Sequence, residues 1–473
     1  MNILHDIIFW TDHLILFYFI GLNSIYLLLL ALSIPEIMLR FKEINSEDIV
    51  DLLKSESIPP ISIIAPCYNE ELSIQESVYS MLHLSYPNLE IIVVNDGSTD
   101  RSLENLIFRY KLRKIPPATS AFLNSSEIKN YYRSDFYPNL LVVDKVNGGK
   151  ADALNAGINV CSSPFFMAVD SDTIIERDAL RRMIRPVLTE PNTIASGGTI
   201  RIVNNCKVES GRVTEVNYPK NILAMIQVVE YLRAFLFGRL GWNHLGGNLV
   251  ISGAFGLFNK EAVINVGGYL TDTVGEDMEL TVRLHRFYRE QKKEYHIAFI
   301  PDPVAWTEVP ESIAVLGHQR ERWHRGLIDT LQRHRKMLLN RKYGVVGFLS
   351  FPFMYFGEML SPLVEIFGYV GMAAGIYFRT IDWKFAIMFF AVAWGLSLIL
   401  TIYTILLEEF TFRRYSKLSD FFRMMFAAIA ENFGYRQIMV FYRLTGFISI
   451  IRKNKSWGKM KRKGFAGEEK EVS

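Results

Sequence analysis

The stretch FFMAVDSDT, residues 165–173, decides the fold. Five apolar residues are followed at once by two carboxylates, Asp170 and Asp172, two positions apart. A short continuous apolar run is typical of a strand buried on both faces of a sheet. An unpaired carboxylate is costly to bury, so the two aspartates need a cation or solvent beside them. The stretch therefore predicts a buried strand that ends at a polar site, although D-x-D by itself also fits a solvated turn.

Similar short apolar runs occur upstream, at residues 61–65, 91–94 and 141–143. The first two are followed by segments with helical character, residues 71–82 and 100–110. Strands that alternate with helices predict an α/β fold with a mostly parallel sheet covered on both faces. Ligands of such sheets bind at the carboxyl ends of the strands. The polar residues expected at those ends are Asn69, Glu70, Asp96, Asp144, Asp170 and Asp172.

The composition points to a soluble domain joined to membrane segments. The chain has 473 residues, of which 50% are hydrophobic and 21% charged, and a formal net charge of +3. A soluble protein of this length is usually less apolar and more charged, and so small a charge does not favour nucleic-acid binding. The three cysteines, Cys67, Cys161 and Cys206, are too few for a disulfide framework. A disordered, fibrous or disulfide-stapled protein is thereby excluded.

An apolar segment near the N-terminus, residues 14–34, contains no charged residue. A helix of that length crosses the roughly 30 Å hydrocarbon core of a bilayer. The alternative is a cleaved signal peptide, but Asp6 and Asp12 precede the run where such a peptide carries positive charge. Because Arg40 and Lys42 follow it, the positive-inside rule places the chain after the helix in the cytoplasm.

A second apolar zone begins at residue 344. Residues 383–407 are predicted to span the membrane, and residues 344–378, broken by Pro352 and Pro362, are predicted to form a re-entrant or interfacial piece followed by a span. Carboxylates in this zone, Glu358 and Glu365, are expected to face protein or water.

Charged residues interrupt the last apolar segment, residues 421–450, which fits a hairpin, a tilted span or a surface helix. The basic tail, residues 453–464, indicates a cytoplasmic end near anionic lipid. We therefore expect a transmembrane helix (residues 1–42), a cytoplasmic domain that ends in interfacial helices (43–343), and transmembrane or interfacial helices with a basic tail (344–473). Within the domain, residues 114–138 show no pattern and are predicted to be a surface insertion.

Three further motifs carry polar side chains suited to chemistry. GGKADALNAG, residues 148–157, could bring Lys150 and backbone N–H groups to a phosphate, although a helix start with a solvated lysine is the default explanation for this motif taken alone. VGEDMEL, residues 274–280, puts two acids at a probable helix start, where a capping preference is an even alternative. HQRERWHRG, residues 318–326, packs arginines, which bind diphosphates, around a tryptophan, which stacks on sugars; a basic amphipathic surface helix is the competing explanation.

The motifs PCYNE, VNDGSTD, GGKADALN, DSD, GED and Q-x-x-R-W occur in this order between residues 61 and 323. Together they resemble the processive family-2 glycosyltransferases, the membrane-embedded synthases of cellulose, chitin, hyaluronan and poly-N-acetylglucosamine. The resemblance implies a nucleotide-diphospho-sugar transferase fold of the A type, inserted between transmembrane helices. One departure is Gly275, where many relatives have threonine before the E-D pair.

The resemblance also implies roles for individual residues. On the donor side, residues that would contact the nucleotide, the sugar or the diphosphate are Asn69, Glu70, Asp96, Lys150, Asp170, Gln319 and Arg322. Asp172 would hold Mg²⁺ or Mn²⁺. Asp277, with Glu276 beside it, would be the general base. On the acceptor side the implied residues are the Trp323 platform and the Ser252 and Gly253 loop.

The expected activity is inverting, metal-dependent transfer from a UDP-sugar to the growing end of a β-linked polysaccharide at the cytoplasmic face of the cell membrane. The resemblance further implies a multi-pass protein, processive synthesis coupled to export, and room for a small accessory membrane subunit. The first donor to consider is UDP-N-acetylglucosamine, then UDP-glucose. Two alternatives stay open: a non-processive transferase that adds one sugar to a lipid or short acceptor, and a non-catalytic transporter or nucleotide sensor.

Overall fold

The computed structural model describes residues 2–44, 58–116, 122–171, 173–209, 211–379, 383–415 and 417–452. It divides into two compact units that interleave along the chain. The first unit comprises Met1–Ile37, Lys220–Gly247 and Pro310–Ser456, and the second comprises Met38–Pro219, Asn248–Val309 and Trp457–Ser473. Each unit is described by itself below.

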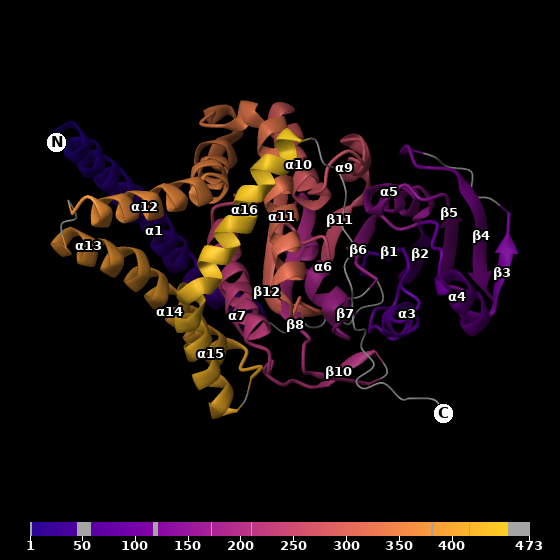
Figure 1. Cartoon of the computed structure of the whole chain (residues 1–473). Helices are drawn as coiled ribbons and strands as arrows, with labels where there is room; N and C mark the ends of the chain where they lie inside the picture. Colours follow the sequence, from indigo (N-terminus) through magenta and orange to yellow (C-terminus); the bar gives the residue numbers. More distant parts are fainter. Residues whose placement is uncertain are drawn as a thin grey trace. The chain divides into compact units, whose positions relative to one another are not determined.

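The second unit is built on one large sheet, with the strand order β3-β4-β5-β2-β1-β6-β11-β8-β12-β7 in the described ranges (Figure 1). Strands β5, β2, β1 and β6 form a parallel centre. The bounds are β1 Ile61–Cys67, β2 Leu89–Asn95, β3 Leu112–Ile115, β4 Ile128–Ser134, β5 Leu140–Lys145, β6 Phe165–Val169, β7 Ile174–Ile175, β8 Thr193–Ile202, β11 Phe255–Asn259 and β12 His296–Thr307. A separate hairpin pairs β9 Lys207–Glu209 with β10 Arg212–Glu215.

Helices cover both faces of the sheet, as an α/β fold requires. Side chains of α5, α9 and α10 share one buried core with the central strands, and α3 and α4 lie on the other side of the sheet from α5 (Figure 1). The bounds are α3 Ile74–Leu82, α4 Ser102–Tyr110, α5 Lys150–Val160, α6 Ala179–Thr189, α9 Lys260–Asn265 and α10 Glu276–Glu290. The carboxyl ends of the parallel strands are left for the polar loops that follow them.

The strand predictions are confirmed at residues 61–65, 91–94, 141–143 and 165–169, and the α/β class with them. A mostly parallel sheet is wrong in part, because β11 runs antiparallel to both β6 and β8. The surface insertion expected for residues 114–138 is also wrong in part. There β3 and β4 form an antiparallel hairpin that extends the sheet from β5. Strand β4, IKNYYRS, carries polar residues on either side of two adjacent buried tyrosines, as suits a partly buried strand next to the edge strand β3.

The first unit is helical. Its elements are α1 Asn2–Ile44, whose end belongs to the second unit, α7 Ile222–Leu232, η1 Arg233–Arg239, α8 Leu240–His244, α11 Ile313–Arg333, η2 Arg335–Met337, η3 Arg341–Tyr343, η4 Val346–Ser350, η5 Phe353–Met359, α12 Ser361–Tyr377, α13 Trp383–Phe390, η6 Ala391–Gly395, α14 Leu396–Thr411, α15 Leu418–Ala430, η7 Glu431–Tyr435 and α16 Arg436–Ile451. The ambiguous segment 421–450 thus contains two helices, α15 and α16. Between them the backbone breaks at Phe433 and Gly434, where Gly434 has a φ of 86°.

The carboxylates expected to avoid lipid do face protein. Glu365 is buried and pairs with Arg436 of α16 at 3.0 Å. Glu358 accepts a hydrogen bond of 2.7 Å from the Tyr26 hydroxyl and lies 3.6 Å from Arg443. The charged residues that interrupt the apolar pattern of α16 are therefore paired with carboxylates of neighbouring helices.

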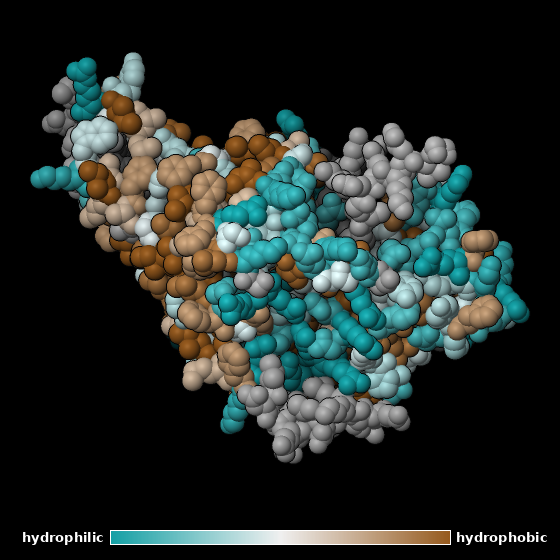
Figure 2. Space-filling model, turned by 90° about the horizontal axis from the view of Figure 1, so that it is seen from below, coloured by the Kyte–Doolittle hydropathy of each residue, from teal (hydrophilic) through white to brown (hydrophobic). Residues whose placement is uncertain are grey.

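Among the described helices, residues 13–42 are long and apolar enough to cross a membrane. The bent pair Val346–Met359 and Ser361–Tyr377, with 40° between its halves, is a second candidate if it forms one span. Figure 2 shows hydrophobic side chains gathered over the helical unit on the face in view. Large apolar side chains are exposed on α12 and α13, among them Phe367, Val370, Tyr377, Trp383 and Ile387. The basic tail, residues 453–464, lies outside the described residues.

Candidate active site

The Lys150 side chain connects the acidic groups of the second unit. Its Nζ lies 2.5 Å from Asp170 Oδ1 and 3.6 Å from Glu276 Oε1, and it donates to the Gly253 carbonyl at 3.2 Å. Burial alone would lower the pKa of Lys150, but the charges of Asp170 and Glu276 outweigh it and raise the pKa above the ordinary lysine value. Lys150 is therefore a permanent cation that joins three separate segments of the chain.

The Asp277 carboxylate lies in the first turn of α10 and is held by backbone groups. Its Oδ2 accepts a hydrogen bond from Gly253 N at 2.9 Å, and its Oδ1 accepts from Met278 N at 2.8 Å. A negative charge at this end of a helix is favoured by the helix dipole. A Cβ at position 253 would lie 3.0 Å from Asp277 Oδ2 and 3.1 Å from Lys150 Nζ. The absence of a side chain there lets the loop at Gly253, the Asp277 carboxylate and the Lys150 ammonium approach one another.

A small cavity of about 10 Å³ lies among these groups. Its polar lining comes from Lys150, Ser252, Tyr269, Glu276 and Asp277, and Gly253 completes that side. The apolar lining comes from Leu154, Ala168 and Phe258. The predicted base, its acidic neighbour, the lysine and the acceptor loop are thus brought together in one place.

Asp96 follows β2 and is only 2% exposed. Its carboxylate pairs with Lys145 Nζ at 2.5 Å and accepts hydrogen bonds from Gly148 N at 2.9 Å and Gly149 N at 2.8 Å. The lysine also lies 2.6 Å from Asp152. Asp96 therefore shapes the glycine loop that leads directly into Lys150.

Lys145 is a residue that sequence reasoning missed. Its side chain is completely buried at the end of β5, between the carboxylates of Asp96 and Asp152. The available signal was a lysine that follows Asp144 at the end of a strand whose first four residues are apolar, LLVVDK. A buried lysine needs an anionic partner, but the sequence pattern does not indicate which carboxylate supplies it.

Asn69 and Glu70 lie in the loop after β1, as expected. Asn69 has a left-handed backbone (φ 55°), and its Oδ1 accepts from Thr99 N at 2.8 Å, which ties the first strand's loop to the second's. The Glu70 carboxylate accepts a hydrogen bond from the Ser73 hydroxyl at 2.7 Å, and the backbone N–H of Glu70 donates to Ser102 Oγ at 2.8 Å. Both residues therefore brace the loop beside Asp96.

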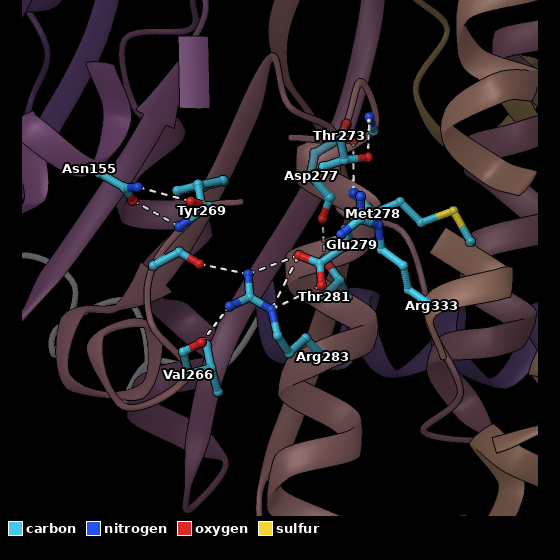
Figure 3. A network of polar contacts seen from close by, with 12 residues as sticks. Asn155, Val266, Tyr269, Thr273, Asp277, Met278, Glu279, Thr281, Arg283 and Arg333 are labelled. Carbon is cyan, nitrogen blue, oxygen red and sulfur yellow. Dashed lines mark hydrogen bonds and ion pairs between the residues drawn. The ribbon is translucent and has the colours of Figure 1, made fainter. Parts of the chain in front are cut away.

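A second network supports α10 and the loop before it. The Arg283 guanidinium pairs with Glu279 at 2.8 Å and donates to the carbonyls of Val266 and Gly268, the latter at 2.6 Å (Figure 3). Thr281 Oγ1 donates to the Asp277 carbonyl at 2.9 Å. The helix that carries the acidic pair is thereby fixed to the loop at residues 266–268.

The D-x-D motif is described at its first member only. Asp170 is bound to Lys150, and its side chain is 31% exposed, so it meets both the cation and the solvent that the sequence requires. Asp172 lies outside the described residues, and no group of three or more potential metal ligands occurs in the described ranges. Carboxylate oxygens of this kind fit Mg²⁺ or Mn²⁺.

The Q-x-x-R-W residues belong to the first unit, on α11. Gln319, Arg322 and Trp323 are spaced three and four residues apart and so share one helix face. The Trp323 ring is 42% exposed and lies under the Arg320 guanidinium, 4.6 Å from it. Gln319 Oε1 is buried without a hydrogen-bond partner in the part of the chain that the structure describes.

Known proteins resemble this chain over much of its length. It is 34% identical over 284 residues to poly-beta-1,6-N-acetyl-D-glucosamine synthase of Staphylococcus epidermidis. The matched residues cover 60% of this chain and 58% of that one. It is 31% identical over 278 residues to the protein of the same name in Staphylococcus aureus (strain COL), covering 59% and 57% of the two chains. The chain thus spans less than two thirds of the length of these relatives.

Among solved structures, a mannosyltransferase from Pyrobaculum calidifontis in complex with GDP-Man and Mn²⁺ is similar with a TM-score of 0.48 and 16% identity, over 88% of this chain and 99% of that one.

Family models match both halves of the predicted domain. The model of glycosyl transferase family 2 matches residues 62–112, where the loops after β1 and β2 lie. The model of glycosyl transferase family group 2 matches residues 165–407, just over half of the chain, and includes D-x-D, the Glu276–Asp277 pair and Q-x-x-R-W. The chain therefore belongs to glycosyl transferase family group 2 and is a glycosyltransferase.

Proposed function

We propose that the protein transfers a sugar from a UDP-sugar to the growing end of a β-linked polysaccharide, by a single inverting displacement at the cytoplasmic face of the membrane. The observation that carries the proposal is the Asp277 carboxylate, fixed by Gly253 N beside the Lys150–Asp170 pair. A sensor or transporter has no use for a carboxylate held in this way, whereas a transferase needs one.

In the proposed reaction, an acceptor hydroxyl attacks the anomeric carbon and passes its proton to Asp277. The new C–O bond forms as the bond from the anomeric carbon to the UDP oxygen breaks, and its electron pair leaves with UDP. A positioned general base contributes about 10²- to 10⁴-fold to such a step. Because Gly253 N and the first turn of α10 already hold the carboxylate, little reorganisation is needed when the acceptor arrives.

The donor is proposed to bind along the loops that follow β1, β2 and β5. Asn69 and Glu70 contribute from the first loop, and Asp96 contributes by holding the glycine loop in shape for the nucleotide. Lys150 then lies next to the donor phosphates, and Asp170 next to the donor sugar or ribose.

The helix α11 is proposed to contribute from the first unit. Gln319 and Arg322 would hold the diphosphate, and the exposed ring of Trp323 would support the acceptor sugar. Gln319 Oε1 is buried and has no hydrogen-bond partner within the described ranges, which supports a ligand-binding role, because a buried acceptor without a partner is costly.

A divalent cation is proposed to be held by Asp172. When bound, it would neutralise charge on the leaving diphosphate. Lys150, whose pKa is raised above the ordinary lysine value, supplies a positive charge in the same site. The two cations would therefore share the neutralisation of the UDP leaving group.

The proposed donor is UDP-N-acetylglucosamine, because the relatives named above are poly-beta-1,6-N-acetyl-D-glucosamine synthases; UDP-glucose is second. Residues 1–42 and the helices after residue 344, which precede and follow the 43–343 domain in the sequence, are proposed to lie in or on the membrane. Processive synthesis with export and a small accessory membrane subunit belong to the same proposal.

The test uses the full chain in membranes, with UDP release measured for a panel of UDP-sugars. Asp277→Asn is expected to abolish transfer while UDP still binds, and Glu290→Gln, the same change at the far end of α10, is the matched control. Full activity in Asp277→Asn would remove this residue as the base, and UDP-sugar binding without turnover in the unaltered protein would favour a sensor.

Product size separates a polymerase from a single-transfer enzyme. A long product from UDP-N-acetylglucosamine supports the proposal, and a glycolipid that carries one sugar rejects processive synthesis. Removing divalent cations with a chelator is expected to abolish transfer, and Asp172→Asn is expected to weaken metal-dependent UDP binding. Metal dependence unchanged in that variant would exclude Asp172 as a ligand.

A further inference from the structure

Tyr269 lines the cavity beneath the acidic pair, yet the proposed mechanism gives it no role. Its side chain is 3% exposed. Buried tyrosine hydroxyls are usually hydrogen-bonded, and the charges of Glu276, Asp277 and Asp170 act on this one. The cavity it lines also borders Glu276 and Asp277. Tyr269 and the two carboxylates therefore line the same small cavity.

The backbone and ring of Tyr269 are held from several sides. Asn155 of α5 accepts from Tyr269 N and donates to its carbonyl, both at 2.8 Å (Figure 3). The preceding Gly268 has a φ of 74°, and a Cβ there would lie 2.5 Å from Asn155 Oδ1, so the clamp requires glycine. The ring meets the Phe258 ring edge-on, with centroids 6.3 Å apart.

The electrostatic surroundings of the hydroxyl agree with its position. Burial raises the pKa of Tyr269 well above its ordinary value, and the charges of Glu276, Asp277 and Asp170 raise it further. The phenol is therefore a neutral donor at every working pH. Lys150 is the cation that faces the same carboxylates.

We infer that this cavity binds one water molecule, which accepts a hydrogen bond from the Tyr269 hydroxyl and donates to the Glu276–Asp277 pair. A cavity of about 10 Å³ holds about one water molecule. A buried water needs two to four polar partners, and Tyr269, Glu276, Asp277 and Lys150 line the space. Tyr269 is then a positioning residue that acts on the base through this water. The catalytic consequence rests on the proposed function, whereas the water site itself does not.

The direct test is a crystal structure of the full chain at a resolution that shows buried waters. We expect density for one water within hydrogen-bond distance of Tyr269 Oη and Glu276. An empty cavity beside other well-resolved buried waters, or a Tyr269 hydroxyl bonded directly to a carboxylate, would overturn the inference. This result does not depend on whether the protein transfers sugar.

The functional test is Tyr269→Phe, which removes the oxygen and keeps the ring against Phe258. Since one hydrogen bond contributes about 0.5–1.5 kcal/mol, kcat is expected to fall about fivefold. The KM for the donor and the Kd for UDP are expected to stay within about twofold, a separation that a general loss of structure would not give. Tyr131→Phe, at a buried tyrosine of β4, is the control. Wild-type kcat in Tyr269→Phe refutes the positioning role, whereas no transfer by the unaltered protein refutes the proposed function.

Discussion

Gly253→Ala tests how closely the base must be placed. The added Cβ would lie 3.0 Å from Asp277 Oδ2, whereas ordinary contacts begin at 3.4 Å, so the carboxylate must retreat by about 0.4 Å (3.4 − 3.0). Lys150 Nζ, at 3.1 Å, must also move. Both atoms end flexible side chains, so the fold should survive. A misplacement of about 1 Å costs about 100-fold in rate, and on that scale a shift of 0.4 Å lowers kcat about five- to tenfold.

The assay is UDP release by the full chain in membranes, with the thermal midpoint and UDP affinity measured beside it. Gly395→Ala is the control, since nothing lies within 4 Å of a Cβ at that position. A Gly253→Ala protein that binds UDP normally and turns over within twofold of the unaltered protein would refute the reasoning. In that case the contact between Gly253 and Asp277 would have no bearing on the reaction.

Three other perturbations test contacts elsewhere in the structure. Burial alone would raise the pKa of Asp302, but the hydrogen bond (2.6 Å) and charge of Arg40 outweigh it and hold the pKa below its ordinary 3.8. The ionised Asp302 therefore stabilises the folded protein above pH 3.8, and this stabilisation is lost as the pH falls through the lower pKa that Asp302 has in the folded state. Acid unfolding curves of Asp302→Asn should not show this loss of stability. Lys145→Met should lower the free energy of unfolding by about 3–5 kcal/mol, because it leaves Asp96 without its buried partner, and Lys145→Arg should lose less in the same denaturant titration. Trp323→Ala should shorten the polymer more than Trp323→Phe, which keeps an aromatic face; equal product lengths on a sizing column would reject the acceptor platform.

Apolar runs in the local sequence predicted the central strands of the sheet. The apolar runs that became β1, β2, β5 and β6 are continuous because these strands are buried on both faces, so their identity could be read without any knowledge of their neighbours. The antiparallel strand β11 could not be placed in this way. Its position between β6 and β8 depends on contacts far apart along the chain. Strand β3 at the edge of the sheet and its neighbour β4 were missed because their charged and polar residues hide the period of a strand.

The residues of the candidate site also differ in whether the local sequence could predict them. Acidic residues that follow a strand or begin a helix were found because their local setting is unusual, as at Asp170 and Asp277. Lys145 and Tyr269 were not found, since each matters through a buried partner supplied by another element. How α11 approaches the acidic residues stays a prediction, as does the division of the chain at residues 42 and 343.

The position of β8 in the sheet has a consequence for biosynthesis. All ten of its residues are buried, and its neighbours in the sheet are β11 and β12. Both of these strands are translated only after residues 220–247, a segment that belongs to the helical unit. A nascent chain must therefore carry β8 with both hydrogen-bonding edges vacant while those helices are made. The order in which the ribosome delivers the strands thus differs from the order in which the sheet can close, and a fragment released at Pro219 would present an aggregation-prone edge.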